Sequence, residues 1–133
     1  MAWLVATRAT CPRRAVGCVL VDEHNHVMAT GYNGVPRGFP HCIDTPCPGA
    51  SHLTGQGLDA CLATHAEQNA LLQCSNVEAI HTVYCTTSPC IHCIKLLLNT
   101  GAQALYVSST YSDPRPLAMW KPRLWIEIPK ENL

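Results

Sequence analysis

Two short motifs bring together residue types that bind zinc. One is His-x-Glu, with His65 and Glu67, and the other is Cys-x-x-Cys, with Cys90 and Cys93. One imidazole and two thiolates supply three ligands and leave the fourth tetrahedral position open, which distinguishes catalytic zinc sites from closed structural ones. We therefore predict that His65, Cys90 and Cys93 hold a catalytic Zn²⁺.

Glu67 adds a proton carrier to this set of ligands. Zinc lowers the pKa of a bound water to near 7. We expect Glu67 to take the proton of that water, pass it to a ring nitrogen of the substrate and later protonate the departing amine. The combination is typical of zinc-dependent nucleobase deaminases. The alternative is that His65 only packs in the core and the two cysteines belong to a structural site.

The composition narrows the class of protein. A chain of 133 residues with 47% hydrophobic and 14% charged residues fits a single domain over residues 1–133. The formal net charge of zero argues against broad nucleic-acid binding, and no apolar run reaches the roughly 18 residues of a membrane span. The first residues lack the pattern of a signal peptide, so we expect a cytoplasmic protein, in which nine cysteines more often indicate metal than disulfides.

The elements that position these motifs follow from the hydrophobic pattern and the turn residues. Apolar and β-branched runs predict strands, and the first two form a hairpin. Ser88-Pro89 is typical of an N-cap and a first-turn proline that open a helix. The expected strands are 15–21, 27–30, 82–87, 104–108 and 125–128, and the expected helices are 3–9, 65–74 and 90–99, with irregular structure or one helical turn over 111–123. This order predicts an α/β fold, an αβα sandwich with a central mixed five-stranded sheet.

Four segments resemble the deoxycytidylate deaminase family, and the match extends over nearly the whole chain, from about residue 4 to 128. They are Arg8-x-Thr10-Cys11-Pro12-Arg13 with Val16-Gly17, Gly31-Tyr32-Asn33-Gly34-Val35-Pro36-Arg37-Gly38, His65-Ala66-Glu67-Gln68-Asn69-Ala70, and Ser88-Pro89-Cys90-x-x-Cys93. The resemblance implies a cytidine-deaminase-like fold and hydrolysis of dCMP to dUMP and ammonia, which feeds dTMP synthesis. It also implies a homo-oligomer, commonly a hexamer, that dCTP with Mg²⁺ activates and dTTP inhibits.

The resemblance also assigns residues to the substrate. Besides His65 and Glu67, it implies that Asn33 contacts the sugar and that Ser88 and Tyr111 lie at the substrate. An amide offers a donor and an acceptor to a hydroxyl. The alternative for Asn33 is a turn role in an Asn-Gly pair.

Effector and second-metal sites are the further expectations. The family places its effector pocket around residues 31–34, and arginines at 8, 13, 14 and 37 are available for a triphosphate. The effector-binding residues we expect are Arg8, Gly31, Tyr32, Asn33, Gly34, Arg37 and Lys95, although Lys95 is also explained as a surface charge. A second zinc is expected at Cys11, Cys42, Cys47 and Cys61, with His41 and His52 as alternative ligands, because these residues are dense in one loop. The shorter first helix and shorter insertion depart from the family pattern.

Three competing functions remain. A tRNA adenosine deaminase shares the zinc motifs but needs a basic surface for RNA, which the zero net charge disfavours. A free cytidine deaminase usually supplies a cysteine where this chain has His65. A non-catalytic zinc module has no use for Glu67 beside an open coordination position.

Overall fold

The structure is a computed structural model that describes residues 1–11, 14–41, 44 and 62–133. Its centre is a five-stranded sheet of order β2-β1-β3-β4-β5. The strands are β1 (Gly17–Val21), β2 (Val27–Tyr32), β3 (Thr82–Thr87), β4 (Ala104–Ser109) and β5 (Leu124–Glu127). Because β1 runs antiparallel to β2 and β3 while β3, β4 and β5 are parallel, the sheet is mixed, as the sequence predicts.

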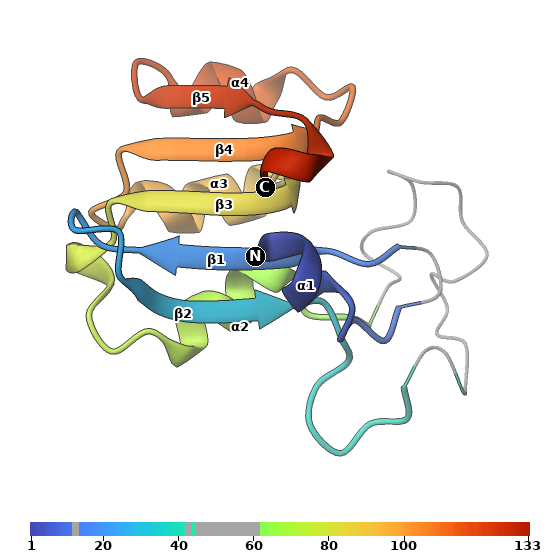
Figure 1. The fold of residues 1–133 in the computed structure, drawn as a ribbon. Helices are drawn as coiled ribbons and strands as arrows, with labels where there is room; N and C mark the ends of the chain where they lie inside the picture. The colour runs from blue at the N-terminus through green and yellow to red at the C-terminus, as the bar shows by residue number, and fades with distance from the viewer. Residues whose placement is uncertain (12–13, 42–43, 45–61) are drawn as a thin grey trace.

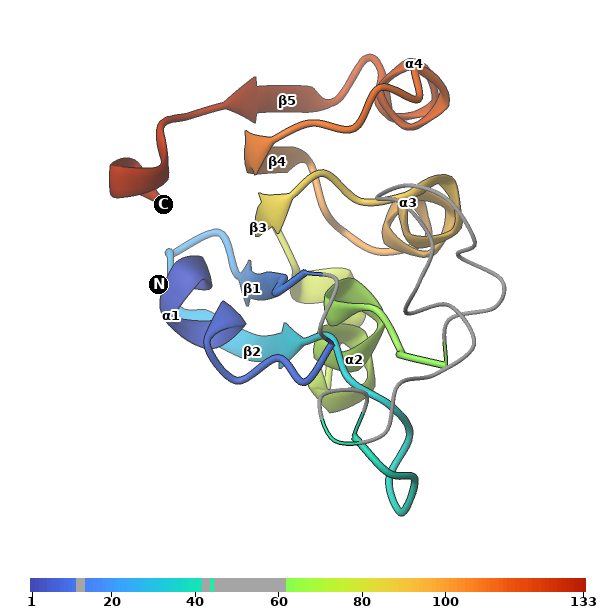
Figure 2. The same ribbon diagram turned by 90° about the vertical axis from the view of Figure 1, so that its right-hand side faces the viewer.

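Helices cover the two faces of the sheet unequally. The helices α2 (Ala66–Gln73), α3 (Ile91–Leu98) and α4 (Arg115–Trp120) lie on one face, and the five-residue α1 (Ala2–Ala6) lies on the other, near the C-terminus (Figures 1 and 2). Short 3₁₀ turns occupy Val77–Ala79 and Lys130–Asn132. No helix in the described part of the chain is both long and apolar enough to cross a membrane.

The main core lies between the sheet and the helices α2 and α3. Strand β1 is buried at all five positions, which matches its unbroken apolar sequence. Its Leu20 packs in one cluster with Ile94 and Leu97 of α3 and Ala70 of α2. Burial of this apolar surface fixes both helices on the sheet, and with them the residues at their N-termini.

Two glycines let helices approach the sheet closely. A Cβ at Gly31 of β2 would lie 2.2 Å from the carbonyl oxygen of Ala66, and one at Gly17 of β1 would lie 2.1 Å from the carbonyl oxygen of Ala2. No side chain fits at such distances, so these positions require glycine for packing. At Gly31 the neighbour is the first residue of α2, which follows His65 directly.

The expected ends of two helices differ from the structure. Helix α3 begins at Ile91 with Cys90 as N-cap, so the prediction that Ser88-Pro89 opens this helix was wrong. The first helix ends at Ala6 and not at residue 9. Of the two alternatives expected for residues 111–123, the structure has the helical one, the six-residue α4 with Pro116 in its first turn.

Candidate active site

His65 and Glu67 are positioned by the N-terminus of α2. His65 is the N-cap, and its backbone N–H donates to the side-chain oxygen of Gln68 at 2.8 Å. The side chain of Asn69 donates to the carbonyl oxygen of Tyr32 at 2.8 Å, which ties this helix to the end of β2. The first bond is one part of a capping box, and the second links the helix to the sheet. Together they fix the start of the helix.

Cys90 and Cys93 are positioned by the N-terminus of α3. Cys90 is the N-cap and Cys93 lies in the first turn, where the helix dipole favours a thiolate. The chain turns into this helix directly after β3, so the site lies at the end of the central strands. Both helix N-termini therefore meet at one edge of the sheet.

The histidine and the two cysteines converge on one point. The Nδ1 of His65 lies 3.5 Å from the Sγ of Cys90 and 3.4 Å from the Sγ of Cys93, and all three atoms lie within 4.8 Å of one another. Zn–N and Zn–S bonds of ordinary length at a tetrahedral angle separate nitrogen from sulfur by about 3.5 Å. The observed distances fit that geometry, and the donor types are those that zinc prefers.

The thiols and the imidazole interact through their protons. The neighbouring Cys93 thiol lowers the pKa of Cys90, and the interaction with Cys90 together with burial raises the pKa of Cys93. The hydrogen bond with Cys90 raises the pKa of His65. Because the three ligand atoms lie so close together, their protonation states depend on one another.

Glu67 is buried directly beside this cluster. Its side chain is only 3% exposed, and burial raises the pKa of its carboxyl group above the ordinary value. A buried carboxyl group with a raised pKa at the wall of a pocket is suited to both accepting and donating a proton.

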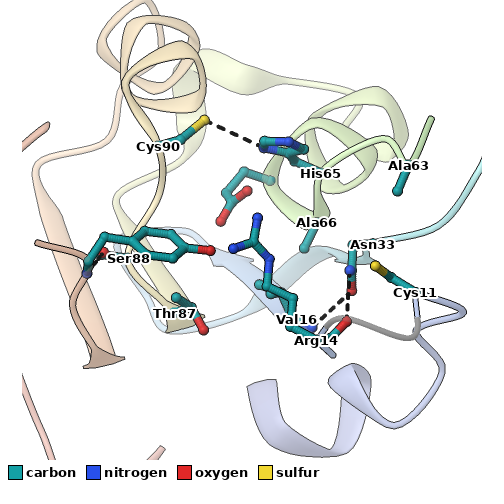
Figure 3. Close-up of a pocket in the computed structure, with 12 residues that line it drawn as sticks. Cys11, Arg14, Val16, Asn33, Ala63, His65, Ala66, Thr87, Ser88 and Cys90 are labelled. Carbon is teal, nitrogen blue, oxygen red and sulfur yellow. Dashed lines mark hydrogen bonds between the residues drawn. The ribbon is translucent and has the colours of Figure 1, made fainter. Parts of the chain in front are cut away.

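A pocket opens in front of this cluster (Figure 3). Its empty volume is about 540 Å³, counting the part open to solvent. It is lined by Cys11, Arg14, Val16, Asn33, Ala63, His65, Ala66, Glu67, Thr87, Ser88, Cys90 and Tyr111. The fold therefore brings together all five residues that the sequence assigns to the substrate, with Cys93 buried behind them.

Two of these substrate residues also hold the pocket wall in place. The Oδ1 of Asn33 accepts a hydrogen bond from the Val16 N–H at 2.8 Å, and its Nδ2 donates to the Arg14 carbonyl oxygen at 3.1 Å. The hydroxyl oxygen of Ser88 accepts a hydrogen bond from the Tyr111 N–H at 2.9 Å. Within the described part of the chain, Asn33 keeps one N–H and one lone pair without a partner, and both could serve a ligand.

The residues expected at an effector site differ in their exposure and in what they contact. Arg8, Tyr32, Arg37 and Lys95 are exposed and do not line the pocket. The space beside Gly31 is filled by the backbone of α2, which leaves no room there for a phosphate, and Gly34 pairs with Thr64 in a short bridge. For a separate effector site, the assignment of these residues stays a prediction.

The expected second zinc site falls largely outside the described residues. Cys42, Cys47, His52 and Cys61 all belong to the part that the structure does not describe. Cys11 is described and lines the pocket, and His41 is exposed. Among the described residues, the His65, Cys90 and Cys93 cluster is the one group with metal-binding geometry.

Arg14 is the pocket residue whose place the sequence reasoning missed. The sequence grouped it with the arginines available to an effector triphosphate, whereas the structure places it in the wall of the pocket, near His65 and Glu67. The available signal was its position directly before the buried β1, because the residues that enter a central strand lie at the edge where the zinc motifs meet.

Comparison with known proteins agrees with this geometry. The sequence model of the cytidine and deoxycytidylate deaminase zinc-binding region matches residues 1–109. The chain belongs to this family. It is 41% identical over 113 residues to the deoxycytidylate deaminase of Saccharomyces cerevisiae, a match that covers 84% of this chain and 36% of the yeast protein.

Two viral members of the family are similar over most of their own length. The deoxycytidylate deaminase of Mycobacterium phage D29 is 38% identical over 110 residues, which cover 77% of this chain and 84% of the phage protein. The crystal structure of the dCMP deaminase of cyanophage S-TIM5 in complex with dCMP and dUMP superposes with a TM-score of 0.71 at 28% identity, covering 95% of this chain and 89% of that one. By contrast, this chain spans about a third of the length of the two fungal relatives.

Proposed function

We propose that this chain is one catalytic domain, residues 1–133, that hydrolyses dCMP to dUMP and ammonia. The observation that carries the proposal is the triangle of His65 Nδ1 and the sulfurs of Cys90 and Cys93, with the buried Glu67 beside it in one pocket. The similarity to dCMP deaminases that are themselves of similar length supports the choice of substrate.

Each residue of the site has a distinct task in this reaction. His65, Cys90 and Cys93 hold Zn²⁺, which supplies an activated water when it is bound. Glu67 takes a proton from the attacking water and delivers it to N3 of the cytosine ring, and it then protonates the leaving amino group. Water contributes its oxygen to the ring carbon that loses the amino group, one proton to N3 and one proton to the departing amino group, so the reaction balances as dCMP plus water to dUMP plus ammonia.

The experiment that tests this function measures ammonia release from dCMP, cytidine and a tRNA hairpin in parallel. We expect turnover of dCMP and little turnover of the other two substrates. Efficient release from the hairpin would favour a tRNA adenosine deaminase, and release from cytidine alone would favour a nucleoside enzyme. Absence of turnover with all three, in protein that contains zinc, would overturn the proposal.

Regulation and assembly form a finer part of the proposal. The family resemblance supports a homo-oligomer, and we propose a hexamer. The same resemblance supports activation by dCTP with Mg²⁺ and inhibition by dTTP. Arg8, Arg37 and Lys95 are exposed, so their positive charges are accessible to the phosphates of such an effector. Steady-state kinetics with dCMP should show apparent affinity raised by dCTP and lowered by dTTP, each through a coupling of about 1–3 kcal/mol. Unchanged kinetics with both triphosphates would overturn this part alone.

A further inference from the structure

Arg14 places a positive charge that no described acid pairs with inside the proposed active-site pocket. The Arg14 side chain extends into the middle of the pocket, on the side that faces His65 (Figure 3). Its Nη1 is buried and has no hydrogen-bond partner within the described part of the chain. A buried guanidinium nitrogen without a partner is costly, so the site calls for an acceptor that a ligand can supply.

The guanidinium is held in a defined position from both ends. Its central carbon lies 5.0 Å from the centre of the Tyr111 ring, in the range of a cation–π contact. The backbone N–H of Tyr111 is fixed by the hydroxyl of Ser88, while the carbonyl oxygen of Arg14 itself accepts the amide hydrogen bond from Asn33. Arg14 is therefore preorganised for binding, and little side-chain entropy remains to be lost.

The charge of Arg14 is not neutralised by an ion pair with any residue that the structure describes. None of the ion pairs formed by the described residues includes Arg14. Among the described residues that line the pocket, Arg14 is the one with a permanent positive charge. The pocket thus favours a ligand that carries an anionic group of its own.

We propose that Arg14, stacked on Tyr111 and positioned by Asn33, binds the 5′-phosphate of the substrate and so selects nucleotides over nucleosides. This inference rests on the proposed function. The planar guanidinium matches the oxygens of a phosphate in a two-pronged hydrogen-bonding arrangement, which a neutral nucleoside cannot provide. A nucleoside in the same pocket leaves the buried Nη1 without an acceptor, which is how a polar site rejects a ligand that lacks the matching group.

The test compares dCMP with deoxycytidine in the zinc-loaded wild-type protein and in Arg14→Gln. The substitution should raise the KM for dCMP about 10- to 100-fold, the size expected for a hydrogen-bonded charge, and leave kcat/KM for deoxycytidine within about twofold. Arg14→Lys keeps the charge but loses the two-pronged geometry, so its KM for dCMP should be intermediate. Lys121→Gln removes one exposed positive charge outside the pocket and should leave both substrates unaffected.

Binding of dUMP and deoxyuridine, measured by calorimetry, gives a second readout that does not require turnover. Arg14→Gln should weaken dUMP about 10- to 100-fold and leave deoxyuridine unchanged. Equal losses for the phosphorylated and unphosphorylated ligands, in a variant that unfolds at the wild-type temperature, would overturn the role of Arg14 while leaving the proposed function intact. A different result would refute the proposed function and keep the phosphate site. In that case the wild-type protein turns over neither dCMP nor deoxycytidine, while Arg14→Gln weakens the binding of dUMP and not of deoxyuridine.

Discussion

Asn33, just beyond the end of β2, accepts a hydrogen bond at 2.8 Å from the backbone N–H of Val16, just before the start of β1. Its amide nitrogen donates to the carbonyl oxygen of Arg14 in the same segment. One buried side chain, only 5% exposed, thus fixes the piece of chain that carries Arg14 into the pocket. Asn33 therefore acts on the pocket wall, in addition to the contact with the substrate that we predict for it.

Replacing this asparagine should affect folding as well as catalysis. Asn33→Ala leaves the buried N–H of Val16 unpaired, so the free energy of unfolding should fall by about 1–3 kcal/mol and the KM for dCMP should rise. Denaturant unfolding and steady-state kinetics on the same preparation measure both effects. Asn33→Ser, whose shorter side chain does not span both contacts, should be destabilised as well. Wild-type stability in both variants would show that Asn33 serves the ligand alone.

Glu67 should be required for chemistry and not for the metal. Glu67→Gln keeps the shape of the side chain but cannot carry a proton, so kcat for dCMP should fall by about 10²- to 10⁴-fold. Zinc content, measured by elemental analysis, should stay at the wild-type value because the three predicted ligands are untouched. Glu78→Gln removes an exposed carboxylate and serves as the matched control. Near-normal kcat in Glu67→Gln would refute the assignment.

The sequence predicts the metal ligands well because each motif is local. His65 and Glu67 are two residues apart, Cys90 and Cys93 are three apart, and each pair lies at a helix N-terminus. Strands are predicted from the sequence for the same reason. The unbroken apolar run of β1, for example, is buried at every position. In both cases the sequence signal is contained in a few neighbouring residues.

The features that the sequence does not predict depend on contacts between distant residues. Ser88 has the residue type of a helix N-cap, but its hydroxyl accepts the N–H of Tyr111, which lies 23 residues away, and the helix begins later. Gly31 has the residue type of a phosphate-binding loop, but its missing Cβ admits the backbone of α2. Arg14 reaches the pocket because Asn33 holds its backbone from 19 residues away. A pattern of neighbouring residues does not predict contacts between residues so far apart in the sequence.

The close approach at Gly31 should make this position sensitive to the smallest substitution. Gly31→Ala places a methyl group 2.2 Å from the carbonyl oxygen of Ala66, which must move, and overpacking of this kind costs about 1–3 kcal/mol or more. Because α2 carries His65 and Glu67, kcat should fall together with the unfolding temperature. Gly34→Ala is the control: its added methyl group would meet the side-chain oxygen of Thr10 at 3.0 Å and so requires a much smaller adjustment. Equal stability of the two variants would contradict the packing role of Gly31.

Removal of one predicted metal ligand should cost one zinc ion per chain. Cys90 and His65 approach to 3.5 Å, and a serine hydroxyl at position 90 is a far weaker zinc ligand than a thiolate. Cys90→Ser should therefore lower the zinc content by about one ion per chain relative to the wild type, whatever other zinc the chain holds, and abolish ammonia release from dCMP. Cys74→Ser is the matched control, because Cys74 packs at the edge of the main core and away from the pocket, so zinc content and activity should be retained. The unfolding temperature should also fall in Cys90→Ser, since a metal bound only by the folded state stabilises that state. An unchanged zinc content in Cys90→Ser would show that the cluster of His65, Cys90 and Cys93 is not the metal site.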